Sequence, residues 1–178
     1  MQFGGTHFVH GSECRNVGLA LGVELNGCHI AEHSDRILHG CGKYISLSDP
    51  ADCSYQIIMA TEIIGLSRKE REIIAYAVKF NTMEFPYYEE LSRETDLDRS
   101  EYLTVAKLTA ILRVANACDR SHKQKFENVK VSLKEKELII QVDTPEDIIL
   151  EMGLFAEKAA FFEEVFSIRT SIHQKKRM

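Results

Sequence analysis

The feature that most constrains the fold is a change in the spacing of apolar residues near Lys125. From Asp98 to Asp119, apolar residues cover most of the circumference of a long helix, which is the pattern of a buried, central helix. After Lys125 the period falls to two, and the alternation continues on both sides of a charged turn at residues 134–136. This alternation predicts a β-hairpin over residues 129–142.

The segment after the hairpin completes a small layered unit. Apolar residues over 154–166 line a helix that would cover one face of the sheet, and residues 168–172 would add a third strand. We therefore expect an α+β fold that is mainly α, with a helical region over residues 1–125 and a ββα(β) subregion over 126–178. Glycines are concentrated in the first 42 residues, so we expect only loose helices there. The structure of residues 1–36 is poorly defined by the sequence.

Two helices with clear start signals precede the long one. Pro50 suits a first helical turn, and Gly65 follows the apolar face of that helix as a stop signal. The next helix opens with a capping box formed by Ser67 and Glu70. The polar stretch at residues 92–98 is interpreted as a connecting loop.

Composition excludes several classes of function. The net charge of -5 arises from 27 acidic and 22 basic residues that form no long block, so nothing global marks a nucleic-acid binder. No apolar run approaches the roughly 20 residues that span a bilayer, and the first residues lack the order of a signal peptide. We expect a cytoplasmic protein that binds neither membrane nor nucleic acid.

Two stretches are more specific than this general pattern. Residues 37–46 read ILHGCGKYIS, and residues 108–122 read LTAILRVANACDRSH. Together they resemble the C-terminal domain of the Ppx/GppA family of exopolyphosphatases and guanosine pentaphosphate phosphohydrolases, and the likeness extends over residues 37–176. The resemblance implies an HD-like helical bundle, a homodimer, and polyphosphate or a guanosine polyphosphate as ligand. It places the hydrolysis in actin-like domains, to which nothing in this sequence is similar.

The resemblance also implies where an HD-type metal site would stand. Such a site holds a divalent metal with imidazole and carboxylate ligands, which lowers the pKa of bound water. His7 and His39 match the imidazole positions, but Gly40 and Asn116 stand where the family pattern has acids. We therefore expect no cofactor and no hydrolysis by this chain alone. The alternative is a metal-dependent phosphohydrolase with a degraded site at His7, His39 and Asp119.

Basic residues gather at the end of the long helix, where the helix dipole favours cations. The resemblance makes them candidates for binding a polyanion, and a solvated helix end is the alternative interpretation. A third hypothesis is a truncated remnant whose helical core persists through oligomerisation. The candidate residues are Arg113, Arg120, His122, Lys123 and Lys125.

Overall fold

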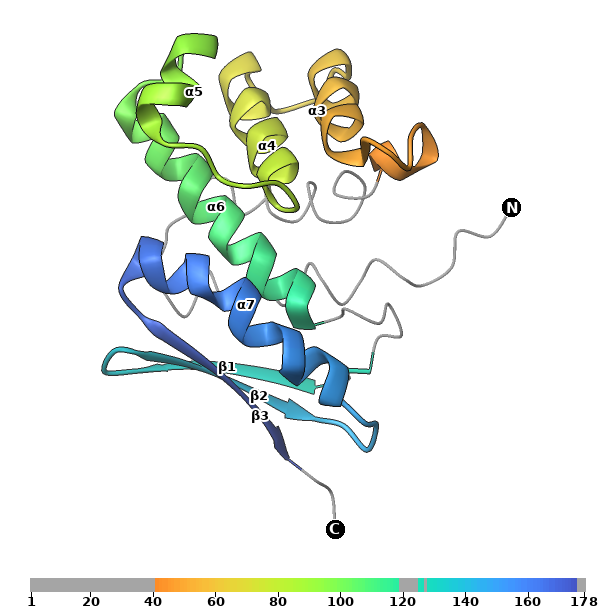
Figure 1. Cartoon of the computed structure of the whole chain (residues 1–178), viewed down its shortest axis with the longest axis vertical. Coiled ribbons are helices and arrows are strands. Elements are labelled where there is room, and N and C mark those ends of the chain that lie inside the picture. The colour runs from red at the N-terminus through yellow and green to blue at the C-terminus, as the bar shows by residue number, and fades with distance from the viewer. Residues whose placement is uncertain (1–40, 119–124, 127, 176–178) are drawn as a thin grey trace.

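The computed structural model describes residues 41–118, 125–126 and 128–175. These residues form a short 3-10 helix, five α-helices and a three-stranded sheet, so the predicted α+β fold, mainly α, is confirmed. The loose helices expected before residue 41 lie outside the described residues. In chain order, with the labels of Figure 1, the elements are η2 (Cys41–Tyr44), α3 (Pro50–Ala60), α4 (Arg68–Phe80), α5 (Tyr88–Glu94), α6 (Arg99–Cys118), β1 (Asn128–Lys134), β2 (Glu137–Asp143), α7 (Ile149–Phe166) and β3 (Arg169–Lys175).

The helix η2 packs on the start of α3 through Gly42. The backbone N–H of Gly42 donates to Ser54 Oγ at 3.0 Å, and that hydroxyl donates to the carbonyl of Pro50 at 2.8 Å. Pro50 occupies the first turn of α3 as predicted, and Asp49 accepts a hydrogen bond from the backbone of that turn. Gly42 therefore lies against backbone atoms of α3, with no room for a side chain.

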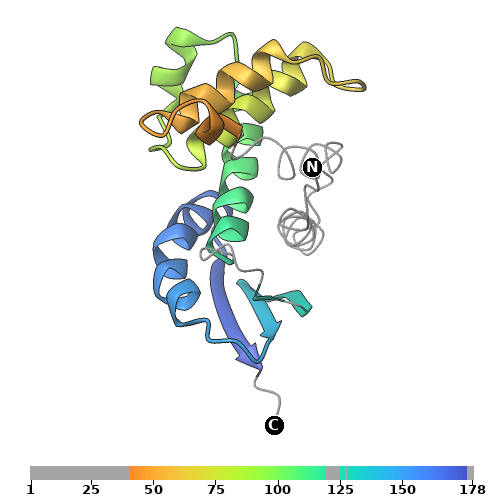
Figure 2. The same cartoon turned by 90° about the vertical axis from the view of Figure 1, so that its right-hand side faces the viewer.

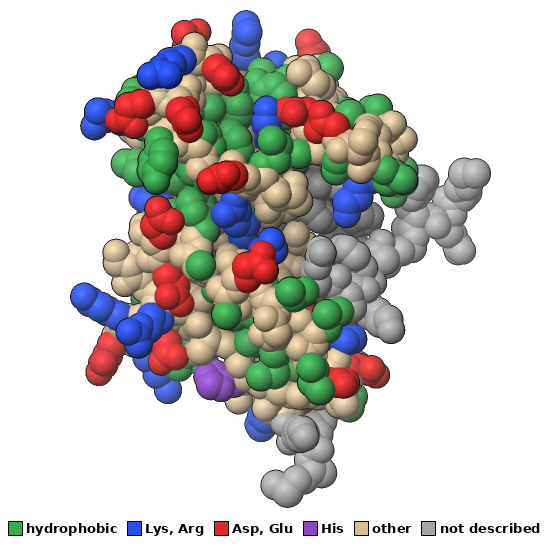
Figure 3. Space-filling model, viewed as in Figure 1, with side chains coloured by type: hydrophobic (Ala, Val, Ile, Leu, Met, Phe, Trp, Pro, Cys, Tyr) green, Lys and Arg blue, Asp and Glu red, His purple; other side chains and the backbone are tan. Residues whose placement is uncertain are grey.

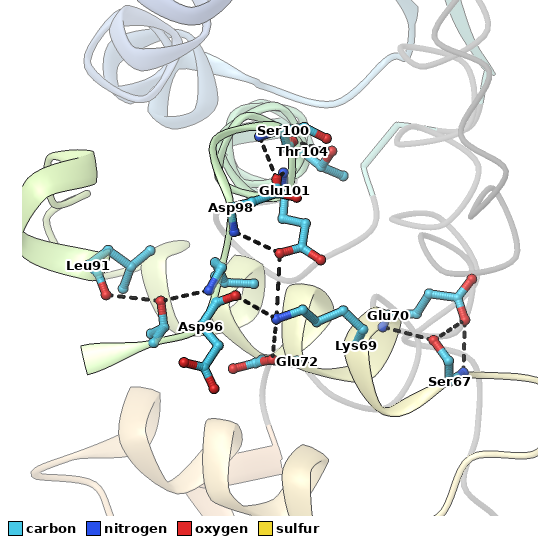
Figure 4. A network of polar contacts seen from close by, with 12 residues as sticks. Ser67, Lys69, Glu70, Glu72, Leu91, Asp96, Asp98, Ser100, Glu101 and Thr104 are labelled. Atoms are coloured by element: carbon cyan, nitrogen blue, oxygen red, sulfur yellow. Dashed lines mark hydrogen bonds and ion pairs between the residues drawn. The ribbon is translucent and has the colours of Figure 1, made fainter. Parts of the chain in front are cut away.

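The predicted capping box at the start of α4 is confirmed. Ser67 Oγ accepts from the backbone N–H of Glu70 at 3.2 Å, and Glu70 Oε2 accepts from the backbone N–H of Ser67 at 2.8 Å. Hydrogen bonds from the Ser67 backbone and hydroxyl lower the pKa of the Glu70 carboxyl below its ordinary value. The start of α4 therefore satisfies its own backbone donors (Figure 4).

The start of α6 has the same kind of cap and is tied to α4. Asp98 Oδ1 accepts from the backbone N–H of Glu101 at 2.8 Å, and Glu101 Oε2 accepts from that of Asp98, also at 2.8 Å. Lys69 of α4 reaches across, donating to the carbonyl of Asp96 at 3.0 Å and lying 3.5 Å from Glu101 Oε2 (Figure 4). Burial opposes its charge, but the carboxylates of Glu72 and Glu101 hold the pKa of Lys69 above its ordinary value.

The loop predicted over residues 92–98 is partly wrong. Helix α5 extends to Glu94, so the first three residues of that stretch form its last turn and only 95–98 connect to α6. This seven-residue helix buries one apolar side chain, that of Leu91, which packs in a cluster with Tyr76 and Phe80 of α4. A single buried residue creates no periodic pattern, so tertiary packing rather than local sequence decides the structure here.

The sheet confirms the predicted hairpin and third strand. Strands β1 and β2 are antiparallel with Val131 opposite Ile140, and β3 runs parallel to β2 with Ile172 opposite the same Ile140. The strand order is therefore β1-β2-β3. In the turn between β1 and β2, Glu135 adopts a φ of 53°, which a two-residue hairpin connection requires at one or both of its central positions.

Helix α7 covers one face of the sheet, and α6 links this layer to the other helices (Figures 1 and 2). The largest apolar core joins the second half of α6, the inner face of β2 and the buried side of α7. Ile111, Ile140 and Phe162 are examples that are almost fully buried. This core crosses the boundary predicted at residues 125 and 126, so the helical region and the ββα subregion share it. Among the described helices, none is long and apolar enough to cross a membrane.

Candidate functional site

Two of the five predicted polyanion-binding residues lie in the described part of the chain. Arg113 is on α6, and Lys125 lies just before β1. The other three, Arg120, His122 and Lys123, lie outside the described residues. The structure therefore shows what two of these cations contact, and the polyanion role of the set stays a prediction.

Arg113 joins three helices. Its Nε and Nη2 donate to the carbonyl of Phe80, at 3.2 and 2.8 Å, and Nη2 also donates to the carbonyl of Met83 at 2.6 Å. The guanidinium lies 4.5 Å from the centre of the Phe161 ring on α7, a cation–π contact. Burial lowers the pKa of Arg113, and the charge of Glu164 partly offsets that effect. Arg113 therefore satisfies the last carbonyl of α4 and one in the turn after it, and holds that end of α4 against α6 and α7.

Lys125 also has partners within the chain. Its Nζ donates to the carbonyl of Asp147 at 2.6 Å and lies 3.2 Å from Oε2 of Glu151 in the first turn of α7. The side chain of Lys125 is 14% exposed and that of Glu151 only 1%. The pair fixes the chain before the sheet to the start of α7. Sequence reasoning missed Glu151, although a lone acid in an otherwise apolar run is a signal that it needs a buried partner.

The three residues of the predicted degraded metal site cannot be placed, because the structure describes none of them. His7, His39 and Asp119 all lie outside the described residues. Asn116 lies on α6, partly buried, three residues after Arg113. Among residues 41–118, 125–126 and 128–175, no group of three or more His, Cys, Asp or Glu side chains has an arrangement that would hold a metal ion.

A groove of about 600 Å³ is lined by residues of α3, α4 and α5, and no sequence pattern predicted it. Its charges are partly paired within the chain, since Lys79 forms an ion pair with Asp52 and also lies over the ring of Tyr55. The hydroxyl of Tyr55 donates to that of Tyr76 at 3.3 Å, and burial raises the pKa of Tyr76 well above its ordinary value. Three helices contribute to the groove, so no local motif would predict it.

Comparison with known proteins agrees with the resemblance in the two motifs. The family model for Ppx/GppA phosphatase, domain III, matches residues 31–158, which is most of the chain. The match includes η2, the helices α3 to α6, the hairpin and the first half of α7. No curated protein sequence gives a significant match. Since the family model covers well over half of the residues, the chain belongs to the Ppx/GppA phosphatase family, and residues 31–158 correspond to its domain III.

Proposed function

We propose that this chain is an accessory domain of an exopolyphosphatase or guanosine pentaphosphate phosphohydrolase. In this proposal it is a cytoplasmic, HD-like scaffold that forms dimers, binds a phosphate polyanion weakly and acts with actin-like catalytic domains. It carries out no hydrolysis by itself and needs no cofactor. The observation that carries the proposal is the family match over residues 31–158, together with the residues that stand at the metal positions.

The donor set does not fit a catalytic divalent cation. Hard divalent cations bind through anionic oxygen ligands, and the family pattern places acids where this chain has Gly40 and Asn116. Asn116 offers a neutral amide. Neither position therefore supplies an anionic ligand, so no catalytic step is assigned to a metal.

The polyanion part of the proposal rests on the cations that directly follow α6. Arg113 and Lys125 are engaged within the chain, and their contacts give them structural roles. Arg120 and Lys123 therefore supply the positive charge in this proposal, with His122 between them. Two side chains that stay positively charged support weak binding of a polyanion. Added salt would weaken this binding, because it screens the charges.

Retention of labelled inorganic polyphosphate tests the polyanion role. We expect the variant Arg120→Glu/Lys123→Glu to bind at least tenfold more weakly than wild type. The matched control is Lys134→Glu/Lys136→Glu, which makes the same charge change at the exposed hairpin turn and should retain most of the binding. Lys125 is left unchanged, because an acid there would face Glu151 and disturb the fold.

Equal losses in the two double variants would show that binding follows net charge and not this site. Competition by guanosine pentaphosphate against labelled polyphosphate then decides which phosphate ligand is preferred. An absence of retention in wild-type protein at low salt would contradict the polyanion role altogether.

A further inference from the structure

The outward side of α7 is apolar where a surface helix ordinarily carries charge. Ile149, Gly153, Ala156 and Ala160 all lie on the exposed side of α7, and their spacing places them in one line along the helix. Ile149 is 74% exposed. Hydrophobic side chains gather over α7 in the space-filling view (Figure 3), most densely toward its first turns.

Two further large apolar side chains widen this surface. Leu150 is 51% exposed and Met152 is 46% exposed, so three large apolar residues occupy four consecutive positions at the start of α7. We call the surface formed by Ile149, Leu150, Met152, Gly153, Ala156 and Ala160 the outer face of α7. Burying such residues on association is favourable in proportion to the apolar area removed from water.

Gly153 supplies a separate indication of an external contact. Glycine inside a helix is less favourable than alanine, because it loses more backbone freedom on folding. Outside its own helical turn, a Cβ atom added at Gly153 would meet no atom of the described residues within 4 Å. The described fold therefore does not require glycine at this position, whereas close approach of another backbone would.

We propose that the outer face of α7 is the interface with a second copy of this chain, packed antiparallel about a two-fold axis. The positions 149, 153, 156 and 160 are spaced by four, three and four residues, so their order is the same read in either direction. A two-fold interface uses the same surface on both subunits. Antiparallel packing sets Ile149 against Ala160 of the partner subunit and Gly153 against Ala156 of the partner subunit.

The pairing matches large side chains with small ones. Ile149 projects from one end of the line and meets an alanine, while the glycine and alanine near the centre let the two helix backbones approach. This proposal identifies the surface for the dimer role in the proposed function, and it rests on that role. It does not involve the cations after α6.

The size and charge of the outer face of α7 determine how tightly we expect the two copies to bind. Helix α7 has 18 residues and is about 27 Å long. One helix pair buries less area than the roughly 1,200 to 2,000 Å² of a standard interface, so we expect a dimer that dissociates on dilution. Glu157, Glu163 and Glu164 flank the outer face on each copy. Because each copy carries a net charge of -5, the two copies repel, and added salt should strengthen the dimer.

Charge substitutions on opposite ends of the line test the antiparallel arrangement. Light scattering on the full chain across a range of concentrations should show dimers for wild type, and monomers for Ile149→Lys and for Ala160→Glu. Mixing these two variants should restore a dimer, because the new lysine of one copy then faces the new glutamate of the other. The control Leu103→Lys changes an exposed apolar residue on α6, which is 54% exposed, and should stay dimeric.

The variant Gly153→Ala tests whether glycine at position 153 serves the contact between two copies or only the fold of one chain. We expect its melting temperature as a monomer to rise, because alanine favours the helix, and its dimer dissociation constant to increase at least threefold. A wild-type chain that stays monomeric at high concentration and high salt would overturn the proposal. So would a mixture of Ile149→Lys and Ala160→Glu that stays monomeric. Polyphosphate retention measured on the monomeric variants shows separately whether the polyanion role holds.

Discussion

Replacing Gly42 with alanine is expected to lower the free energy of unfolding by about 3 kcal/mol, at the upper end of the cost of overpacking. An added Cβ would overlap the carbonyl oxygen of Pro50 and would lie 2.7 Å from both the backbone nitrogen and Oγ of Ser54. Two of these three atoms belong to the backbone of α3 and have no rotamer by which to move away. The substitution must therefore displace η2 from α3 and break the hydrogen bond from Gly42 to Ser54.

Urea unfolding of the purified variants measures this effect. The matched control is Gly153→Ala, the same chemical change at a glycine whose added Cβ meets no atom of the described residues within 4 Å outside its own helical turn. At a concentration where the protein is monomeric, that control should be stabilised by about 0.5–1 kcal/mol. A Gly42→Ala variant within about 0.5 kcal/mol of wild type would show that η2 does not pack closely on α3.

Replacing Lys125 with methionine is expected to lower the free energy of unfolding by about 3–5 kcal/mol, because it removes one partner of a buried ion pair. The Glu151 carboxylate would lose the ammonium at 3.2 Å while remaining almost fully buried in α7. The hydrogen bond from Lys125 to the carbonyl of Asp147 would be lost as well. Chemical denaturation followed by far-ultraviolet circular dichroism measures the change.

The double variant Lys125→Met/Glu151→Met distinguishes the loss of stability caused by breaking the ion pair from that caused by lost packing contacts. Apolar replacement of both members of a buried pair is often close to neutral, so we expect the double variant to recover most of the lost stability. The exposed pair Lys158 and Glu157 provides a control, since Lys158→Met should change stability by less than about 1 kcal/mol. A double variant as unstable as Lys125→Met would contradict this account of the pair.

The elements with local signals were predictable from the sequence. Ser67 and Glu70 form a cap within one helical turn, and the alternation on both sides of residues 134–136 specifies a hairpin without reference to the rest of the chain. The long apolar helix was recognised for the same reason, because its pattern repeats over many turns. Helix α5 was partly missed because its stability comes from one side chain, that of Leu91, packed against α4.

The contacts of the candidate site were not predictable in the same way. Arg113 and Lys125 were grouped because they are close in sequence and share a charge. The structure connects Arg113 to Phe80, 33 residues away, and Lys125 to Glu151, 26 residues away. Contacts at such separations depend on how the helices pack, which no local pattern specifies. The family, in contrast, was recognisable from residues 37–46 and 108–122, and the family match over residues 31–158 confirms it.

The most direct test of the proposed accessory role is phosphate release by the highly purified chain. The protein would be incubated with inorganic polyphosphate, and separately with guanosine pentaphosphate, in the presence of magnesium or manganese. We predict no release above that of a heat-denatured sample, because the positions at Gly40 and Asn116 supply no anionic ligand. Release that a chelator abolishes and added metal restores, and that His39→Ala eliminates, would contradict the account.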